Sequence, residues 1–208
     1  AEYKVRQLEK YLFGKNKPKP GDPLYKMNVQ GTKKDNLSDK IGGTYGCVRY
    51  VKDTKFHNCD EWSQNIIDFP TVSGKTKVHD GLDLSATTGT PVYAMYKGRF
   101  TCGYSNSIGY YVQIESLPEE HGLQFEESTI YIWYGHLSSY ENNLNGTIVE
   151  QGTLIGYTGN SGTIASEIEE WQYHLHLTIY KGSLLKYNRT NPTKYLNTKF
   201  DSNGNKIE

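Results

Sequence analysis

The sequence has no excess of charge of either sign, since 23 Lys and Arg residues balance 23 Asp and Glu residues. A chain without a basic excess has no long-range electrostatic attraction for nucleic acid or for an anionic membrane surface. The sequence also lacks any apolar run near the roughly 20 residues that a membrane-spanning helix needs. The composition therefore predicts a hydrophilic protein with no nucleic-acid partner and no membrane span.

Cysteine is scarce as well. Cys47, Cys59 and Cys102 are too few for a disulfide-dense scaffold, and their spacing does not make a CxxC zinc motif. Cys47 and Cys59 could pair and leave Cys102 free, or all three could be free thiols. The sequence leaves both arrangements open.

Methionine, a helix former, is nearly absent, whereas glycine and tyrosine are frequent, with 21 Gly and 18 Tyr among 208 residues. Glycine marks turns and tyrosine favours pleated surfaces, so this composition favours β-structure. From Gly42 onward, short alternating runs separated by turn residues predict a mainly β protein with a single antiparallel β-sheet domain. The expected strands cover residues 46–51, 90–96, 98–104, 110–116, 129–137, 152–159 and 173–180.

The ends of the chain differ from this middle region. The first fifteen residues place apolar side chains at helical spacing before Gly14, and "KNKPKPGDP" reads as a linker. Residues 1–40 are therefore expected to form a short N-terminal helical or irregular appendage without chemistry. Residues 41–200 should form the β-domain, and residues 201–208 a polar, frayed tail.

The stretch "VHDGLDLS" separates two sets of side chains if it is extended. One face carries His79, Gly81 and Asp83, and the other is apolar. The members of the apolar face are Val78, Leu82 and Leu84, together with Asp80. A straight strand would put the Cα atoms of His79 and Asp83 about 13 Å apart, which is too far for one metal ion. The chain must bend, and Gly81 permits a bulge or turn there.

Three further histidines lie in or near expected strands. "YHLHLTIY" places His174 and His176 at i and i+2, about 7 Å apart on one face, so both can point into one small site. His136 ends the run "YIWYGH" and is expected at a strand terminus. A catalytic zinc site uses three protein ligands and leaves one position open, which suits this supply of histidine and aspartate.

Other histidines are given structural interpretations. His57 lies in "FHNCDEW", where no second element of a catalytic triad is recognisable, and His121 in "PEEHGLQFEES" is expected to be a solvated loop residue. No HExxH motif occurs, so the helix-borne zinc site with a glutamate base is excluded.

The ordered motifs make one resemblance specific. "HDGLD", "GTPVYA", "YGHL", "GTLIGYTGNSG" and "HLHL" follow one another in the chain, and "NPTKYL" comes after them. This series resembles the M23 family of zinc metallopeptidases, the lysostaphin- and LytM-like endopeptidases, over about residues 42–197. The resemblance implies a β-sheet domain of the LytM/M23 type.

The resemblance also implies roles for particular residues. His79, Asp83 and His176 match the ligands of Zn²⁺, whereas His136 and His174 match two active-site histidines that do not bind the metal. No residues for another cofactor are implied. Zinc lowers the pKa of bound water to about 7. One of the two other histidines would then accept the water proton, and the other would bind the oxyanion of the intermediate.

The implied function is that of a zinc-dependent endopeptidase hydrolysing peptide cross-links or stem peptides of bacterial peptidoglycan. The expected protein is a monomer that acts outside the cytoplasm, in the periplasm or after secretion, and Tyr104, Tyr110 and Tyr134 could line its groove. The alternatives are a catalytically inactive M23-like domain that binds cell wall or regulates another hydrolase, and a structural zinc domain. Remodelling of the cell's own wall and attack on other bacteria are both compatible with this site.

The chain departs from the family pattern in three places. The segment 163–173 is longer and more acidic than usual, and Leu177 and Thr178 follow the HxH motif where Phe and Glu are common. Residues 51–76 precede the first ligand as an insertion that could form a flap or a partner-binding loop. The groove shape and the bond preference are therefore left open by the sequence.

Overall fold

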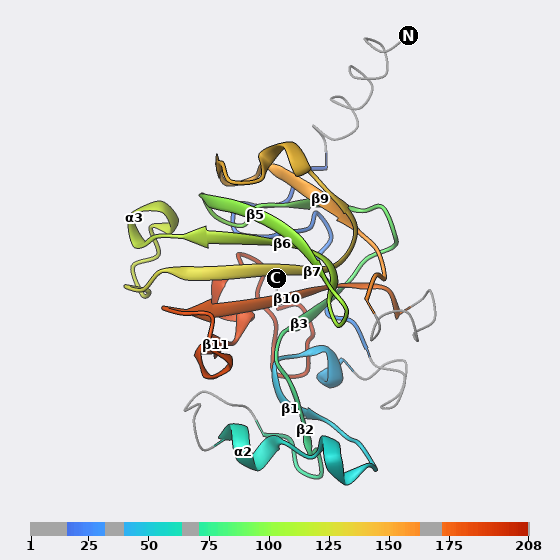
Figure 1. Ribbon diagram of the computed structural model, residues 1–208. Coiled ribbons are helices and arrows are strands. Elements are labelled where there is room, and N and C mark those ends of the chain that lie inside the picture. The colour runs from blue at the N-terminus through green and yellow to red at the C-terminus, as the bar shows by residue number, and fades with distance from the viewer. Residues whose placement is uncertain (1–15, 32–39, 64–70, 163–171, 208) are drawn as a thin grey trace.

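The computed structural model describes residues 16–31, 40–63, 71–162 and 172–207 (Figure 1). The helix expected within the first fifteen residues lies outside the described residues, as does most of the segment 163–173. Among the described residues, no helix has the length and apolar character needed to cross a membrane.

A nine-stranded antiparallel sheet forms most of the molecule, which confirms the prediction of a mainly β fold (Figure 1). Its order is β11-β10-β7-β6-β5-β8, while β3 pairs with β10, and β9 pairs with β7 and β4. The strands are β3 (Leu82–Ser85), β4 (Pro91–Tyr93), β5 (Gly98–Ser105), β6 (Gly109–Ser116), β7 (Ile130–Tyr140), β8 (Ile148–Val149), β9 (Leu154–Thr158), β10 (His174–Lys181) and β11 (Arg189–Thr190).

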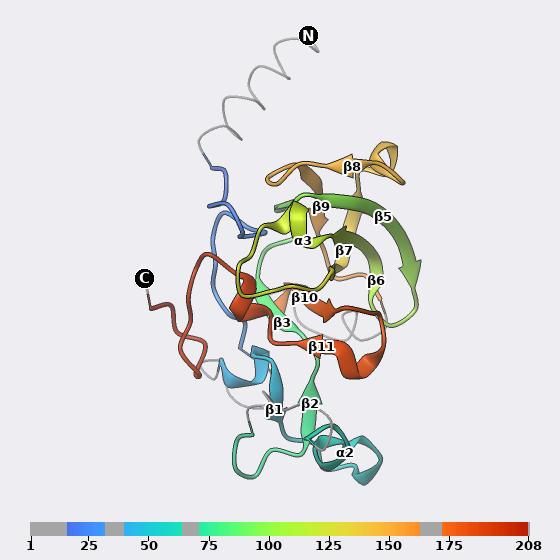
Figure 2. The ribbon, with the colours of Figure 1, turned by 90° about the vertical axis from the view of Figure 1, so that its left-hand side faces the viewer.

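A two-stranded sheet lies at one end of the molecule, beyond β3 (Figure 2). It pairs β1 (Gly46–Arg49) with β2 (Lys77–His79), and the chain between them contains η2 (Thr54–Phe56) and α2 (Cys59–Ser63). Cys47 and Cys59 form a disulfide with a Cα–Cα distance of 5.6 Å, so the pairing left open by the sequence occurs and Cys102 is free. The disulfide ties α2 to the small sheet.

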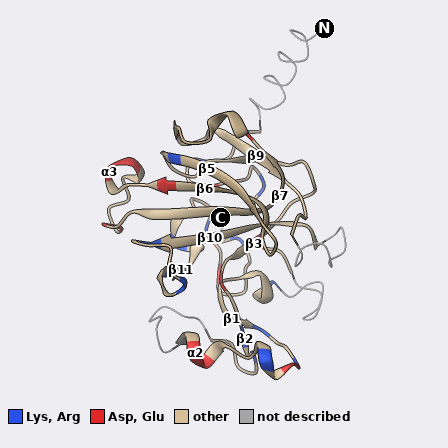
Figure 3. Ribbon diagram, viewed as in Figure 1, with Lys and Arg blue, Asp and Glu red and all other residues tan. Residues whose placement is uncertain are grey.

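The other helices in the described ranges are short and lie in connections. They are α3 (Pro118–His121) and the 3-10 helices η1 (Ile41–Gly43), η3 (Asn142–Leu144), η6 (Lys186–Asn188) and η7 (Pro192–Tyr195). Basic and acidic residues both occur around the main sheet and around the small sheet (Figure 3). The neutral charge balance is therefore not a sum of oppositely charged halves.

Alternation along the strands builds the core. On β10, Leu175, Leu177 and Ile179 are fully buried, while His174 and His176 point to the other face, as the sequence predicted. Tyr134, which could either line a groove or serve simply as a strand residue, is fully buried, and its hydroxyl accepts a hydrogen bond from Met95 N at 2.9 Å. Tyr134 is therefore a core residue on the inward face of β7.

The described part of the expected N-terminal appendage packs into this core. Leu24, Met27 and Val29 are buried members of the hydrophobic cluster, and Val29 forms a β-bridge with Leu84. Gln30 N donates to the Asp83 carbonyl at 2.8 Å. Residues 21–31 therefore belong to the packed body of the domain rather than to a linker.

The polar tail and His121 also differ from expectation. Phe200 and Lys206 form a β-bridge, so the tail folds back on itself instead of fraying. His121 is buried at the end of α3, where its Nδ1 accepts from Leu123 N (3.1 Å) and its Nε2 lies 3.0 Å from the Ser128 carbonyl. Backbone groups satisfy both ring nitrogens, which is why this histidine tolerates burial.

Candidate metal centre

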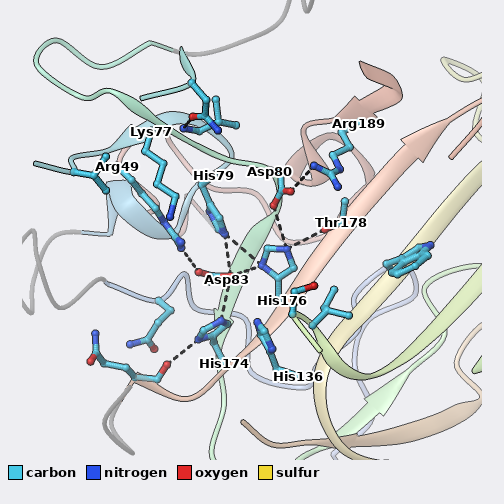
Figure 4. A pocket seen from close by; sticks show the side chains of 18 of the residues that line it. Arg49, Lys77, His79, Asp80, Asp83, His136, His174, His176, Thr178 and Arg189 are labelled. Atoms are coloured by element: carbon cyan, nitrogen blue, oxygen red, sulfur yellow. Dashed lines mark hydrogen bonds and ion pairs between the residues drawn. The ribbon is translucent and has the colours of Figure 1, made fainter. Parts of the chain in front are cut away.

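Three side chains predicted as metal ligands meet at the junction of the two sheets (Figure 4). His79 ends β2, Asp83 lies on β3, and His176 lies on β10. Asp83 Oδ1 is 3.1 Å from His79 Nε2 and 2.8 Å from His176 Nδ1, and the two nitrogens are 3.4 Å apart. The structure therefore brings these donors together on one point.

Strand pairing produces this meeting. His176 and Asp83 are direct partners in the antiparallel pair of β10 and β3, and His79 is paired with Gly46 in the small sheet. Side chains directly opposite one another on antiparallel strands are close neighbours, so two of the donors are placed by the ladder itself. The third depends on the bend between β2 and β3.

The predicted bend occurs at Asp80 and Gly81, but glycine is required there for an additional reason. A Cβ atom at Gly81 would lie 2.7 Å from His176 Nε2 and 2.6 Å from the Leu177 carbonyl oxygen. These distances are below normal van der Waals contact, so the absent side chain makes room for the His176 ring.

Asp80 was predicted on the apolar face, and this prediction was wrong. Its Oδ2 accepts from Arg189 Nη1 at 2.5 Å, and its Oδ1 is 3.5 Å from His176 Nε2 (Figure 4). The alternation of an extended chain ends where β2 stops, so the bend turns Asp80 towards the site. The alternation of side chains along a strand could not predict the direction of Asp80, because this residue lies in the bend.

Each of the three donor side chains also contacts a residue outside the cluster. His79 Nδ1 lies 2.8 Å from the Thr44 carbonyl, His176 Nε2 lies 3.0 Å from Thr178 Oγ1, and Asp83 Oδ2 accepts from Arg49 Nη2 at 2.5 Å. Such outer contacts orient metal-binding side chains and fix which histidine nitrogen is available. The atoms that remain directed at one another are His79 Nε2, Asp83 Oδ1 and His176 Nδ1.

His136 and His174 complete a cluster of five side chains. The His136 ring centroid is 5.3 Å from that of His174 and 5.7 Å from that of His176. His136 Nδ1 lies 2.8 Å from the Ser161 carbonyl, and His174 Nδ1 lies 2.8 Å from the Gln172 carbonyl. Donation from each Nδ1 to its carbonyl leaves both Nε2 atoms able to take up a proton.

His136 was expected at a strand terminus, yet it lies inside β7. Pairing of β7 with β10 reaches Gly135, and pairing of β7 with β9 begins at Leu137. His136 itself has a φ of 58°, the only positive φ of a non-glycine residue in the described ranges. A non-glycine residue in this region is uncommon and strained, which is a feature that clusters at functional sites.

Burial and neighbouring groups shift the pKa values of the four histidines in different directions. Burial lowers the pKa of His79 to about 4 and that of His136 to about 3, and it also lowers the pKa of His174. Burial acts in the same direction on His176, but hydrogen bonds to Asp80 and Asp83 outweigh it and raise its pKa to about 9. Three of the four imidazoles are therefore neutral near pH 7 in the metal-free protein.

Asp83 shows the opposite behaviour. Although burial alone would raise the pKa of this carboxyl, its electrostatic interactions with His174, His79 and Arg49 and a hydrogen bond from His176 hold the pKa well below its ordinary value. A buried carboxylate beside imidazole nitrogens is an arrangement that attracts a cation.

The cluster opens onto a cavity of about 520 Å³. One wall comes from the small sheet and the insertion between its two strands, and the other from the β5–β6 hairpin and the main sheet. Residues of the first wall include Arg49, Tyr50, Val51, Asn58 and Lys77, and those of the second include Ser105, Ser107, Ile108, Trp133 and Tyr180. Part of the insertion 51–76 is therefore a wall of the site, whereas Tyr104 and Tyr110 are exposed outside this cavity.

The fold and the site define a mainly β protein whose sheet carries a histidine and aspartate cluster of the kind that holds a catalytic metal. The family model described as peptidase family M23 matches residues 77–192, more than half of the chain. The chain therefore belongs to peptidase family M23, which confirms the resemblance carried by its motifs. All five clustered residues lie in the matched range, whereas β1 and α2 precede it.

The chain is also similar to several solved structures. The catalytic domain of the antimicrobial peptidase lysostaphin from Staphylococcus simulans is 23% identical, with 73% of this chain and 87% of that chain covered and a TM-score of 0.48. A mutant of the catalytic domain of the prophage-encoded M23 protein EnpA from Enterococcus faecalis is 27% identical, covering 59% and 81%, with a TM-score of 0.42. LytU is 27% identical, covering 59% and 75%, with a TM-score of 0.45. No curated protein matches the chain.

Proposed function

We propose that this protein is a zinc-dependent endopeptidase that hydrolyses peptide cross-links or stem peptides of bacterial peptidoglycan. The observation that carries the proposal is the convergence of His79, Asp83 and His176, whose donor atoms lie within 4.8 Å of one another beside His136 and His174. Membership of a peptidase family supports peptide-bond hydrolysis, and the motif resemblance to lysostaphin- and LytM-like endopeptidases supports peptidoglycan as the source of the peptide.

The donor chemistry fits zinc. Two imidazoles and one carboxylate are a ligand set that zinc takes in catalytic sites, where the fourth position stays open for substrate or water. His79, Asp83 and His176 would hold the ion through Nε2, Oδ1 and Nδ1, the atoms that their outer contacts leave directed inward. When bound, the ion would act as a Lewis acid that polarises the scissile carbonyl and makes water a better nucleophile at neutral pH.

The two remaining histidines would move protons. Each donates from Nδ1 to a backbone carbonyl, which fixes the ring and leaves Nε2 able to take up a proton, and His174 Nε2 lies 3.4 Å from Asp83 Oδ1. One ring would accept the proton of the attacking water and return it to the leaving amine. The other, protonated at Nε2, would donate to the oxyanion as negative charge develops there.

We further propose that the protein acts as a monomer outside the cytoplasm, either in the periplasm or after secretion. The Cys47–Cys59 disulfide supports this location, because disulfides persist in oxidising compartments and are rare in the cytosol.

Digestion of purified peptidoglycan tests the proposal. The zinc-loaded protein should release new amino groups, chelation should stop the release, and added zinc should restore it, with mass spectrometry of the fragments identifying the bond. Zinc binding without amine release from any peptidoglycan would overturn the enzyme proposal in favour of an inactive domain that binds cell wall or regulates another hydrolase.

A further inference from the structure

Asp80 and Arg189 make contacts that the proposed chemistry does not use. Arg189 Nη1 donates to Asp80 Oδ2 at 2.5 Å, while Asp80 Oδ1 faces His176 Nε2 at 3.5 Å (Figure 4). His176 therefore has a carboxylate at each ring nitrogen, with Asp83 at Nδ1 and Asp80 at Nε2. Asp83 belongs to the predicted ligand group, whereas Asp80 lies on the opposite side of the His176 ring.

The Arg189 side chain is itself fixed by several contacts. Its guanidinium carbon lies 5.3 Å from the ring centroid of Trp62 and 5.3 Å from that of Tyr180, and its Nε donates to the Tyr180 hydroxyl at 3.1 Å. The Tyr45 hydroxyl donates to the Arg189 carbonyl at 3.1 Å. An arginine held by two aromatic rings and hydrogen bonds is a rigid partner for a carboxylate.

We propose that Asp80, held in place by Arg189, is the positioning residue that presents Nδ1 of His176 to the metal. This inference rests on the proposed function, because it assigns His176 as a ligand. A histidine that offers Nδ1 to a metal carries its remaining proton on Nε2. A carboxylate can only accept a hydrogen bond, so once Nδ1 is bound to the metal, Asp80 favours the ring state with the proton on Nε2.

Thr178 is closer to the same nitrogen, at 3.0 Å, but it acts differently. A hydroxyl can donate or accept, so Thr178 is compatible with either ring state and does not select one. Thr178 steadies the ring, whereas Asp80 determines where its proton lies. The two roles can be separated by substitution.

The insertion before the first ligand, residues 51–76, also supports the Asp80–Arg189 pair. Trp62 lies on α2, and the disulfide from Cys59, the first residue of α2, to Cys47 ties that helix to the small sheet. The insertion therefore contributes to the metal site through Trp62, Arg189 and Asp80 in turn. Trp62 and the disulfide precede the part of the chain matched by the family, whereas Asp80 and Arg189 lie within it.

The experiment measures zinc affinity by competition with a chelator in the full chain. Asp80→Ala should weaken zinc binding about 10- to 100-fold, the range typical of lost outer-shell partners. Asp80→Asn keeps an acceptor oxygen and should lose less. Thr178→Val should lose less than Asp80→Ala, and Glu150→Ala, which removes an exposed ion pair with Lys97, should leave the affinity unchanged.

A second readout separates positioning from general damage to the fold. In the zinc-loaded wild type, nitrogen-15 NMR should show the proton of His176 on Nε2 and protected from exchange. In zinc-loaded Asp80→Ala that protection should be lost, while the other histidine signals keep their positions.

The outcomes distinguish this inference from the proposed function. If the wild type binds zinc but Asp80→Ala binds it equally well with the same Nε2 proton protection, the positioning role is wrong and the function stands. The role is also wrong if Thr178→Val loses more affinity than Asp80→Ala. If the wild type does not bind zinc through His176, both the function and the inference fail.

Discussion

The two sheets that meet at the site differ in what stabilises each of them. The main sheet fixes β3 and β10 by an antiparallel ladder that carries Asp83, His174 and His176, and the ladder between β7 and β10 reaches Gly135, next to His136. The small sheet has two strands, which are marginal alone, and relies on a disulfide and on ion pairs to the main sheet. The main sheet therefore carries four of the five clustered side chains, whereas the small sheet carries His79 together with residues that orient the others.

This division predicts a ranking of effects. Substitutions of the three predicted ligands, His79 on the small sheet and Asp83 and His176 on the main sheet, should abolish metal binding. Substitutions of His136 and His174 should stop turnover with metal retained, and substitution of an orienting residue on the small sheet, such as Arg49, should loosen the site.

Asp83→Ala should produce the largest loss. The carboxylate contacts His79, His174, His176 and Arg49, so its removal takes away the one anionic donor of the cluster. Zinc affinity should fall by more than about 100-fold, beyond the range of outer-shell substitutions. Chelator competition measures the affinity, and circular dichroism checks that the sheet persists. Stoichiometric tight zinc in this variant would contradict the assignment of Asp83 as a ligand.

His136→Ala and His174→Ala should each retain zinc and lose turnover. General acid and base groups contribute about 100- to 10,000-fold, so amine release from peptidoglycan should fall by that factor. The metal content of the purified variants provides the control. Unchanged turnover in both variants would remove these histidines from the mechanism, and loss of zinc in either would make it a ligand.

Arg49→Ala should have an intermediate effect on the site. Arg49 donates to Asp83 Oδ2 and from its Nε to the Gly42 carbonyl at 2.7 Å, which turns Oδ1 towards the histidines. Its removal should weaken zinc binding about 10-fold, the lower end of the outer-shell range, because Asp83 itself remains. Arg99→Ala on β5, where the guanidinium donates to the Gly146 carbonyl, is the matched control and should bind zinc normally. If both variants bind zinc with equal affinity, Arg49 of the small sheet does not orient Asp83 for metal binding.

Cys47→Ser combined with Cys59→Ser should have the smallest effect on chemistry. The disulfide closes a loop with a sequence separation of 12, and cross-links of such loops contribute about 3 kcal/mol by restricting the unfolded chain. The free energy of unfolding should fall by about that amount, while zinc affinity in the folded protein changes only a few fold. A complete loss of zinc binding with the main sheet intact would mean that the small sheet is more than a support.

Much of the main sheet could be predicted from the sequence because alternation is a local property. Leu175, Leu177 and Ile179 alternate with His174 and His176, and the strand pattern alone separates the core from the site. The same local reasoning required a bend between His79 and Asp83. It could identify Gly81 as permissive, but not the His176 ring that occupies the space of a side chain there.

The contacts that orient the site were not predictable in this way. Arg49 and Asp83 are 34 residues apart, and Asp80 and Arg189 are 109 residues apart. No periodicity connects such positions, because their pairing depends on how the small sheet packs on the main sheet. The buried residues Leu24 and Met27 were missed for a related reason, since Pro, Gly and Lys around them gave the segment the composition of a linker.

Anomalous diffraction at the zinc edge from crystals of the loaded protein would show which side chains hold the ion. Two groups of three donors lie within reach of an ion, His79 with Asp83 and His176, and His136 with His174 and His176. The account predicts one zinc bound by His79 Nε2, Asp83 Oδ1 and His176 Nδ1, with His136 and His174 outside its coordination. A zinc held instead by His136, His174 and His176 would contradict it.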